Sequence, residues 1–163
     1  MNAESKIEKI WSLLKEVPDP EIPVINVVEL GIVRDVKFDN NLLLVTVTPT
    51  YSGCPATKTI EDDIRAKLVD NGYSNFQIET TYQPAWTTDW ITEQARSKLR
   101  AYGIAPPEKA SLDKTDLIGG SPKECPQCQS KNTSLISQFG STPCKALYTC
   151  NECKEPFDYF KCH

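Results

Sequence analysis

Long apolar runs are absent from this chain of 163 residues. No stretch approaches the roughly 20 apolar residues that a membrane-spanning helix needs. Residues 1–16 carry acidic side chains where a secretory signal has a basic start and an apolar run. These absences predict a cytoplasmic protein that has no membrane partner.

A surplus of positive charge is also missing. The 18 lysine and arginine residues are outnumbered by 22 aspartate and glutamate residues, which gives a net charge of −4 and a pI near 5.1. Proteins that bind nucleic acid without sequence preference do so by neutralising phosphates with clustered basic residues. The acidic balance therefore predicts no nucleic-acid partner, although the chain has finger-like cysteine pairs.

Cysteine, in contrast, occurs seven times. An odd number that includes two tight Cys-x2-Cys pairs suits metal thiolates in a reducing compartment better than a secreted disulfide frame. Cys125 pairs with Cys128 and Cys150 with Cys153, so that each pair can present two sulfurs to one ion. We predict a tetrathiolate zinc site, with iron as the alternative ion that four sulfurs would also hold.

The segment 125–163 depends on such a metal to fold. Chains below about 40 residues usually need disulfides, a metal or a partner, because they cannot bury enough apolar surface. Zinc binding contributes roughly 10–16 kcal/mol to the folding of comparable sites, since the unfolded chain offers no preformed site. We therefore predict that residues 125–163 form a zinc ribbon.

Three potential ligands fall outside the predicted tetrad: Cys144, Cys162 and the sole histidine, His163. They have two interpretations that the sequence leaves open. They are either incidental core and surface residues, or they form a second metal site, because a Cys-Cys-His set suits iron or a transferred cluster.

The segment before the ribbon has a regular hydrophobic pattern. Apolar residues recur at helical spacing in some stretches and form strand-like runs in others. The predicted elements are a helix at 3–17, strands at 32–38 and 42–48, a helix at 56–68, a strand at 75–82 and a helix at 92–102. We predict an α+β fold, with an α-β-β-α-β-α domain at 1–104, a linker at 105–124 and the zinc ribbon at 125–163.

A second site of interest is the turn Ser52-Gly53-Cys54-Pro55. Proline suits the first helical turn, so that Cys54 would lie at the N-cap of the helix that follows. Unpaired amides and the positive end of the helix dipole would stabilise a thiolate there, as nucleophile or soft-metal ligand. The alternative is an inert buried cysteine, and position alone does not decide between the two.

The segments DPEIPVINVVELGIVRDV, at 19–36, and VTVTPTYSGCPATKTIEDDI, at 45–64, resemble the SufT-like metal-sulfur cluster assembly domain. The resemblance covers roughly residues 5–102 and implies a role in iron-sulfur cluster maturation. It also implies that Cys54 is the reactive cysteine of a Gly-Cys-Pro turn. Asp19 and Glu21 match the acidic Asp-Pro-Glu motif, as supporting metal or partner contacts or as turn caps between prolines.

Together with the C-terminal ribbon, the whole chain resembles the PaaD family of bacterial aerobic phenylacetate degradation. The resemblance implies an auxiliary factor of the phenylacetyl-CoA 1,2-epoxidase that assembles or delivers an iron-sulfur or iron centre. Its expected partners are the oxygenase and reductase subunits and the iron-sulfur assembly machinery. Its expected cofactors are zinc and a transient iron-sulfur cluster or iron.

A catalytic role is not expected. The sequence has neither a pair of di-iron carboxylate helices nor a glycine-rich nucleotide-binding loop. Oxygenation and NADPH oxidation therefore belong to other subunits, and we predict no catalytic residue. The alternative to a maturation factor is a stoichiometric structural or interaction subunit with a purely structural zinc site.

Overall fold

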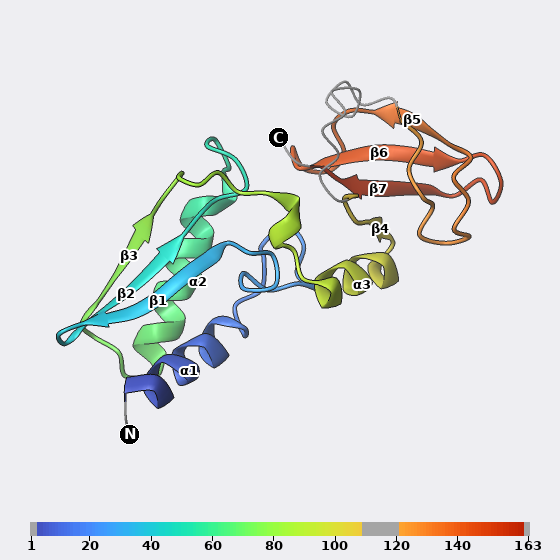
Figure 1. The fold of residues 1–163 in the computed structure, drawn as a ribbon. Coiled ribbons are helices and arrows are strands. Elements are labelled where there is room, and N and C mark those ends of the chain that lie inside the picture. The colour runs from blue at the N-terminus through green and yellow to red at the C-terminus, as the bar shows by residue number, and fades with distance from the viewer. Residues whose placement is uncertain (1–2, 109–120, 162–163) are drawn as a thin grey trace. The chain divides into compact units, whose positions relative to one another are not determined.

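The computed structural model describes residues 3–108 and 121–161 (Figure 1). In chain order the elements are α1 (Ala3–Leu14), β1 (Val33–Asp39), β2 (Leu42–Val47), α2 (Ala56–Asp70), β3 (Phe76–Thr80), the 3-10 helix η1 (Thr88–Trp90), α3 (Glu93–Tyr102), β4 (Ile104–Ala105), β5 (Thr133–Ser137), β6 (Lys145–Cys150) and β7 (Pro156–Phe160). The predicted α+β class and the predicted order α-β-β-α-β-α before the ribbon are confirmed.

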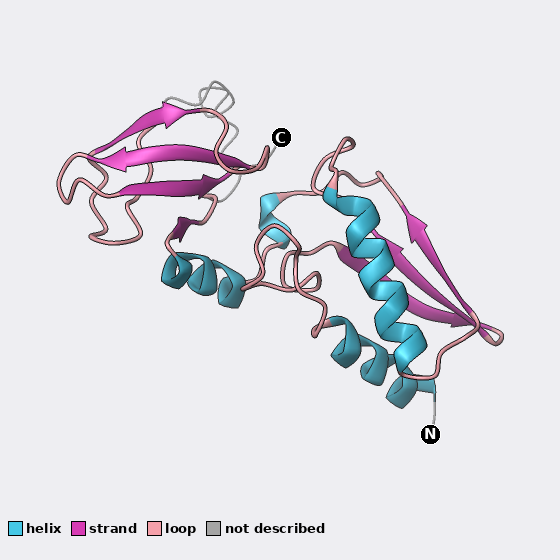
Figure 2. Ribbon diagram, turned by 180° about the vertical axis from the view of Figure 1, so that it is seen from behind, coloured by secondary structure: helices cyan, strands magenta, loops and turns pink. Residues whose placement is uncertain are grey.

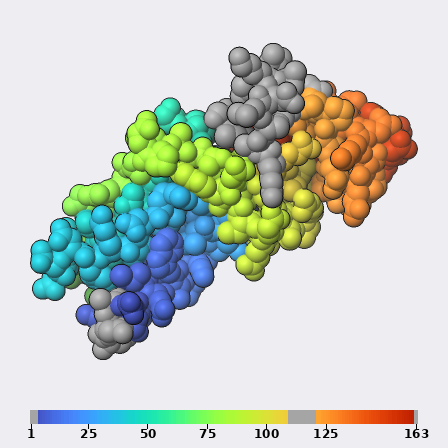
Figure 3. All heavy atoms as spheres, in the orientation of Figure 1, coloured from blue at the N-terminus to red at the C-terminus, as the bar shows by residue number. Residues whose placement is uncertain are grey.

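The first compact unit comprises Met1–Trp86 and Trp90–Thr92. Its sheet has the order β1-β2-β3, in which β1 and β2 are antiparallel and β2 and β3 are parallel. Both α1 and α2 lie on one face of this sheet (Figure 2). The space-filling view shows the opposite side, where β1 and β2, in blue and cyan, form part of the surface (Figure 3).

The core of this unit follows the hydrophobic pattern. Alternate residues of β2, Leu43, Val45 and Val47, are at most 1% exposed, as expected for the inward face of a half-buried strand. From α2, Ile60 and Ile64 are buried, and their spacing of four residues puts them on one helical face.

The ends of the helices differ slightly from the predicted ones. The first helix ends at Leu14, before the predicted Val17, because Pro18 disfavours the helical conformation of the residue before it. Val17 is nevertheless only 3% exposed, which explains its apolar identity. The second helix continues to Asp70, and Gly72, with φ 85°, follows its end.

The second compact unit comprises Thr87–Asp89 and Glu93–His163. Its sheet has the order β4-β7-β6-β5, with β4 parallel to β7 and the other pairs antiparallel. The centre of its core is Tyr148, whose ring stacks on Phe157 at a centroid distance of 5.8 Å. Cys125 and Cys150 belong to the same buried cluster, so the ribbon core and the cysteine site are built together.

This division differs from the predicted domain ranges, because α3 and β4 belong to the same unit as the ribbon. Ile104 and Ala105 pair with Asp158 and Tyr159 of β7. The buried guanidinium of Arg96 donates hydrogen bonds to the carbonyls of Thr88 and Pro107. Sequence patterns carry no signal for this arrangement, because a two-residue strand is too short to show a periodicity. None of the helices in the described ranges is long and apolar enough to cross a membrane.

Candidate metal centre and reactive cysteine

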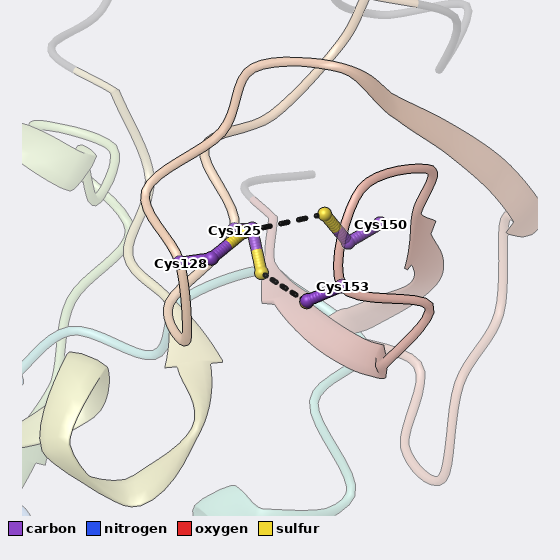
Figure 4. Close-up of side chains that lie close together, drawn as sticks. All are labelled: Cys125, Cys128, Cys150 and Cys153. Carbon is purple, nitrogen blue, oxygen red and sulfur yellow. Dashed lines mark hydrogen bonds between the residues drawn. The ribbon is translucent and has the colours of Figure 1, made fainter.

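The four cysteines of the predicted tetrad converge on one point (Figure 4). The Sγ atoms of Cys125 and Cys153 are 3.7 Å apart and those of Cys128 and Cys150 are 3.5 Å apart. All four sulfurs lie within 4.8 Å of one another. A tetrahedral zinc with bonds of about 2.3 Å requires sulfur separations of about 3.8 Å. The donor set therefore fits one zinc ion with only small adjustments.

Two equivalent turns of the backbone position these sulfurs. The Gln129 N–H donates to the Cys125 carbonyl at 2.9 Å, and the Lys154 N–H donates to the Cys150 carbonyl at 3.1 Å. Each donor directly follows the second cysteine of its pair, and each has a left-handed backbone, with φ 62° and 67°. Sequence analysis missed these two residues. The signal that could have revealed them is their position after each Cys-x2-Cys pair, where the chain must reverse.

Two thiols of this site, Cys150 and Cys153, have pKa values that are shifted in opposite directions. Burial raises the pKa of the Cys150 thiol, but amides of Cys153 and Glu152 and the Cys128 thiol lower it, and the net result is a fall from 9.0 to about 7. For Cys153 the amide of Glu155 lowers the pKa, whereas desolvation and the neighbouring thiols raise it to about 12. A bound dication would replace the protons that these thiols hold.

Cys54 lies in the turn before α2, at the position directly before the N-cap and not at the N-cap itself. The N-cap is Pro55 and not the predicted Cys54. The Cys54 carbonyl nevertheless accepts a hydrogen bond from the Thr57 N–H at 3.3 Å, so that Cys54 directly adjoins the first turn. The Cys54 N–H donates to the Tyr51 carbonyl at 3.2 Å. The side chain is partly exposed, so that a partner or ion can reach the thiol. Within the described ranges Cys54 belongs to no cluster of metal-ligand side chains.

Of the two acidic residues near the N-terminus, Asp19 caps a turn. Asp19 is 5% exposed, and its Oδ1 accepts hydrogen bonds from the N–H groups of Glu21 and Ile22 at 2.9 and 2.7 Å. This is the turn cap that we gave as one interpretation. Glu21 is half-buried, beside a backbone that Asp19 holds in place.

Cys144 lies apart from the tetrad. It precedes β6, whereas Cys150 ends the same strand, and six residues of strand span about 20 Å. Its buried sulfur is 3.1 Å from Oγ1 of Thr142. Burial lowers the pKa of Lys161, and the charge of Cys144 opposes that shift. Cys162 and His163, the other members of the suggested second site, lie outside the described residues.

Two family models match the chain. Residues 7–71 match a model described as iron-sulfur cluster assembly protein, and residues 112–161 match the PaaD zinc beta ribbon domain. Fold and site thus define a class of protein in which an iron-sulfur assembly domain is followed by a zinc ribbon. Over 162 residues the chain is 49% identical to a putative 1,2-phenylacetyl-CoA epoxidase subunit of Escherichia coli, covering 98% of this chain and 95% of the relative. The chain belongs to the family of that epoxidase subunit.

Other relatives match a little over half of the chain. An Fe-S protein maturation auxiliary factor of Porphyromonas gingivalis is 37% identical over 56% of this chain and 89% of the relative. The solved structure of a domain of unknown function, DUF59, from Bacillus anthracis is 30% identical, with a TM-score of 0.56 over 60% of this chain and 93% of that chain. These matches support the predicted relation to cluster assembly domains.

Proposed function

We propose that this chain is an auxiliary factor of the 1,2-phenylacetyl-CoA epoxidase that assembles or delivers an iron-sulfur or iron centre to the epoxidase or its reductase. The observation that carries the proposal is the nearly end-to-end similarity to the Escherichia coli epoxidase subunit, combined with the match of residues 7–71 to cluster assembly proteins. The proposed partners are the oxygenase and reductase subunits and the iron-sulfur assembly machinery. The chain itself catalyses no step of the epoxidation.

Cys54 is the proposed ligand for the transferred centre. It lies inside the matched assembly domain and its side chain is accessible. Iron-sulfur clusters are generally held by several cysteine thiolates, and in the part of the chain that the structure describes Cys54 belongs to no group of three or more potential metal ligands. The remaining ligands would therefore come from the donor, the recipient or a second copy of the chain. Such shared ligation suits transfer rather than permanent storage.

The tetrathiolate of the second unit has a different proposed role. Zinc, held by Cys125, Cys128, Cys150 and Cys153, would satisfy all four coordination positions with protein sulfur, which is typical of structural zinc. It would offset half of the negative charge of the four thiolates and hold the two cysteine turns together. We assign partner recognition to the ribbon that this ion stabilises.

The same closed four-sulfur site favours one alternative function. A stoichiometric structural subunit would need the zinc only to stabilise an interface with the oxygenase, and Cys54 would then have no role in metal transfer. The two functions predict different effects of a substitution at Cys54.

The test is to produce the oxygenase and reductase subunits in cells with the wild-type chain, with Cys54→Ser or with Ser52→Ala. Ser52 is an exposed residue of the same turn and serves as the matched control. We expect iron or sulfide in the purified epoxidase components to fall with Cys54→Ser and to stay at the wild-type level with Ser52→Ala. Full loading with Cys54→Ser would refute the delivery role and support the structural alternative.

A further inference from the structure

The two cysteines of each turn differ in their exposure to solvent. In each pair the first cysteine, Cys125 or Cys150, has 0% exposure, and the second, Cys128 or Cys153, is exposed. We propose that metal enters and leaves this centre over the edge formed by Cys128 and Cys153. These two sulfurs are also the positions at which soft electrophiles and competing ligands attack. The inference rests on the proposed zinc occupancy of the tetrad.

The inner side of the centre is closed by the ribbon core. Cys125 and Cys150 are members of the buried cluster that includes Tyr148 and Phe157. These rings are at most 4% exposed and stack on each other. A chelator or reagent that approached from this side would have to displace a close-packed aromatic pair of the core, which makes this approach unfavourable.

Among the described residues, the outer side carries the two short cysteine turns, which are mostly polar. Of the residues between and directly after the paired cysteines, Gln127, Gln129, Glu152 and Lys154 are exposed, whereas Pro126 and Asn151 are half-buried. The Lys154 ammonium donates to the carbonyl of Asn151, within its own turn. Among the described residues, therefore, polar and exposed side chains flank the Cys128–Cys153 edge.

Ligand exchange at zinc proceeds readily when an incoming donor can bind before an old one leaves, since zinc tolerates five ligands transiently. Exposure also controls how fast a thiolate reacts with electrophiles. Both considerations select Cys128 and Cys153. An attack on one of them removes a single ligand and leaves the ion on three sulfurs, two of them buried, from which it dissociates outward.

The test is pulsed alkylation of the zinc-loaded full chain with N-ethylmaleimide, followed by peptide mass spectrometry and by a zinc-release assay with a chromophoric chelator. The reaction adds the thiolate sulfur across the maleimide double bond, and water supplies the proton to the carbon beside the carbonyl. We expect Cys128 and Cys153 to be labelled about tenfold faster than Cys125 and Cys150, because reactivity follows exposure. Zinc release should follow the labelling of the first two and be first order in maleimide.

Equal labelling rates for all four cysteines, or a release rate that does not depend on maleimide concentration, would overturn the proposal, because the ion would then leave before any sulfur is attacked. Partly exposed Cys54 and buried Cys144 report the reactivity of thiols outside the centre in the same sample. Zinc analysis before labelling separates this result from a failure of the proposed occupancy. A chain that holds no zinc contradicts the proposed function of the ribbon, whereas a loaded chain with uniform labelling contradicts only the exchange edge.

Discussion

At the residue scale, two thiols of the metal centre, Cys150 and Cys153, have pKa values that are shifted in opposite directions. With a pKa of about 7, Cys150 is mostly deprotonated above neutral pH, whereas Cys153, with a pKa of about 12, keeps its proton. Zinc binding must therefore displace the Cys153 proton throughout the neutral range, and the Cys150 proton in addition when the pH falls below about 7.

This difference predicts the pH dependence of zinc affinity. Affinity should fall as the pH decreases, because protons compete with the ion. The plot of log affinity against pH should become steeper below about pH 7, by about one proton. Competition titrations with a chromophoric chelator across this range measure the slope. A slope that is constant through pH 7 would show that Cys150 does not release its proton there.

Gly31 is a second position at which one residue controls local structure. It has φ 75°, and an added Cβ would lie 2.6 Å from the Trp90 Cβ. Gly72 has a similar φ of 85° but no atom within 4 Å of the corresponding position. Both substitutions to alanine carry the cost of a left-handed residue, about 1–2 kcal/mol. Only Gly31→Ala adds a steric clash.

We therefore expect Gly31→Ala to lower the free energy of unfolding of the first unit by about 1–3 kcal/mol more than Gly72→Ala does. Urea denaturation of the two variants, monitored by far-UV circular dichroism, provides the comparison. Equal losses would mean that the segment holding Trp90 moves away from Gly31 without cost.

Sequence reasoning at this scale succeeded where the chemistry is encoded in spacing. The tetrad could be predicted because two Cys-x2-Cys pairs specify four sulfurs regardless of the fold around them. The predicted N-cap of the second helix was wrong by one residue: the N-cap is Pro55 and not Cys54. The choice between these two residues depends on backbone angles, which the sequence does not give. The roles of Cys54, Asp19 and Glu21 in metal handling stay predictions.

At the scale of elements, one buried cation of α3 links this helix to neighbouring segments of the second unit. Arg96 is 6% exposed, and its guanidinium donates to the Thr88 carbonyl at 2.7 Å and also to the Pro107 carbonyl. The hydrophobic pattern predicted α3 correctly as a helix but could not predict which unit it joins, since that depends on two carbonyls outside the helix.

Replacing Arg96 tests how much this cation contributes to the stability of α3 in the second unit. Arg96→Met keeps the aliphatic stem but leaves two buried carbonyls without their donor, which we expect to cost about 2–4 kcal/mol of unfolding free energy. Arg100 is an exposed residue of the same helix, and Arg100→Met should change stability by less than about 0.5 kcal/mol. Thermal unfolding of the zinc-loaded variants measures the difference. Similar values for both would mean that Arg96 contributes little to holding α3.

At the scale of the whole molecule, the chain combines a partly exposed thiol, Cys54, with a four-sulfur site built from its own side chains. The order of the elements in the first unit was predictable from periodicity, because each helix and strand there buries one apolar face. The strands of the second unit were not predicted. Its core is small and is built around Cys125 and Cys150, together with residues such as Tyr148 and Phe157. We accordingly propose cluster handling for the first unit, and stability and recognition for the second.

The most direct test of this division of roles is anaerobic iron, sulfide and zinc analysis, with absorption spectra, of the wild-type chain and Cys54→Ser purified from the same iron-supplied cells and after reconstitution. We predict zinc in both proteins, and iron with sulfide in the wild type alone. A wild-type chain that holds zinc but accepts neither iron nor cluster on reconstitution would contradict the central claim that Cys54 carries the transferred centre.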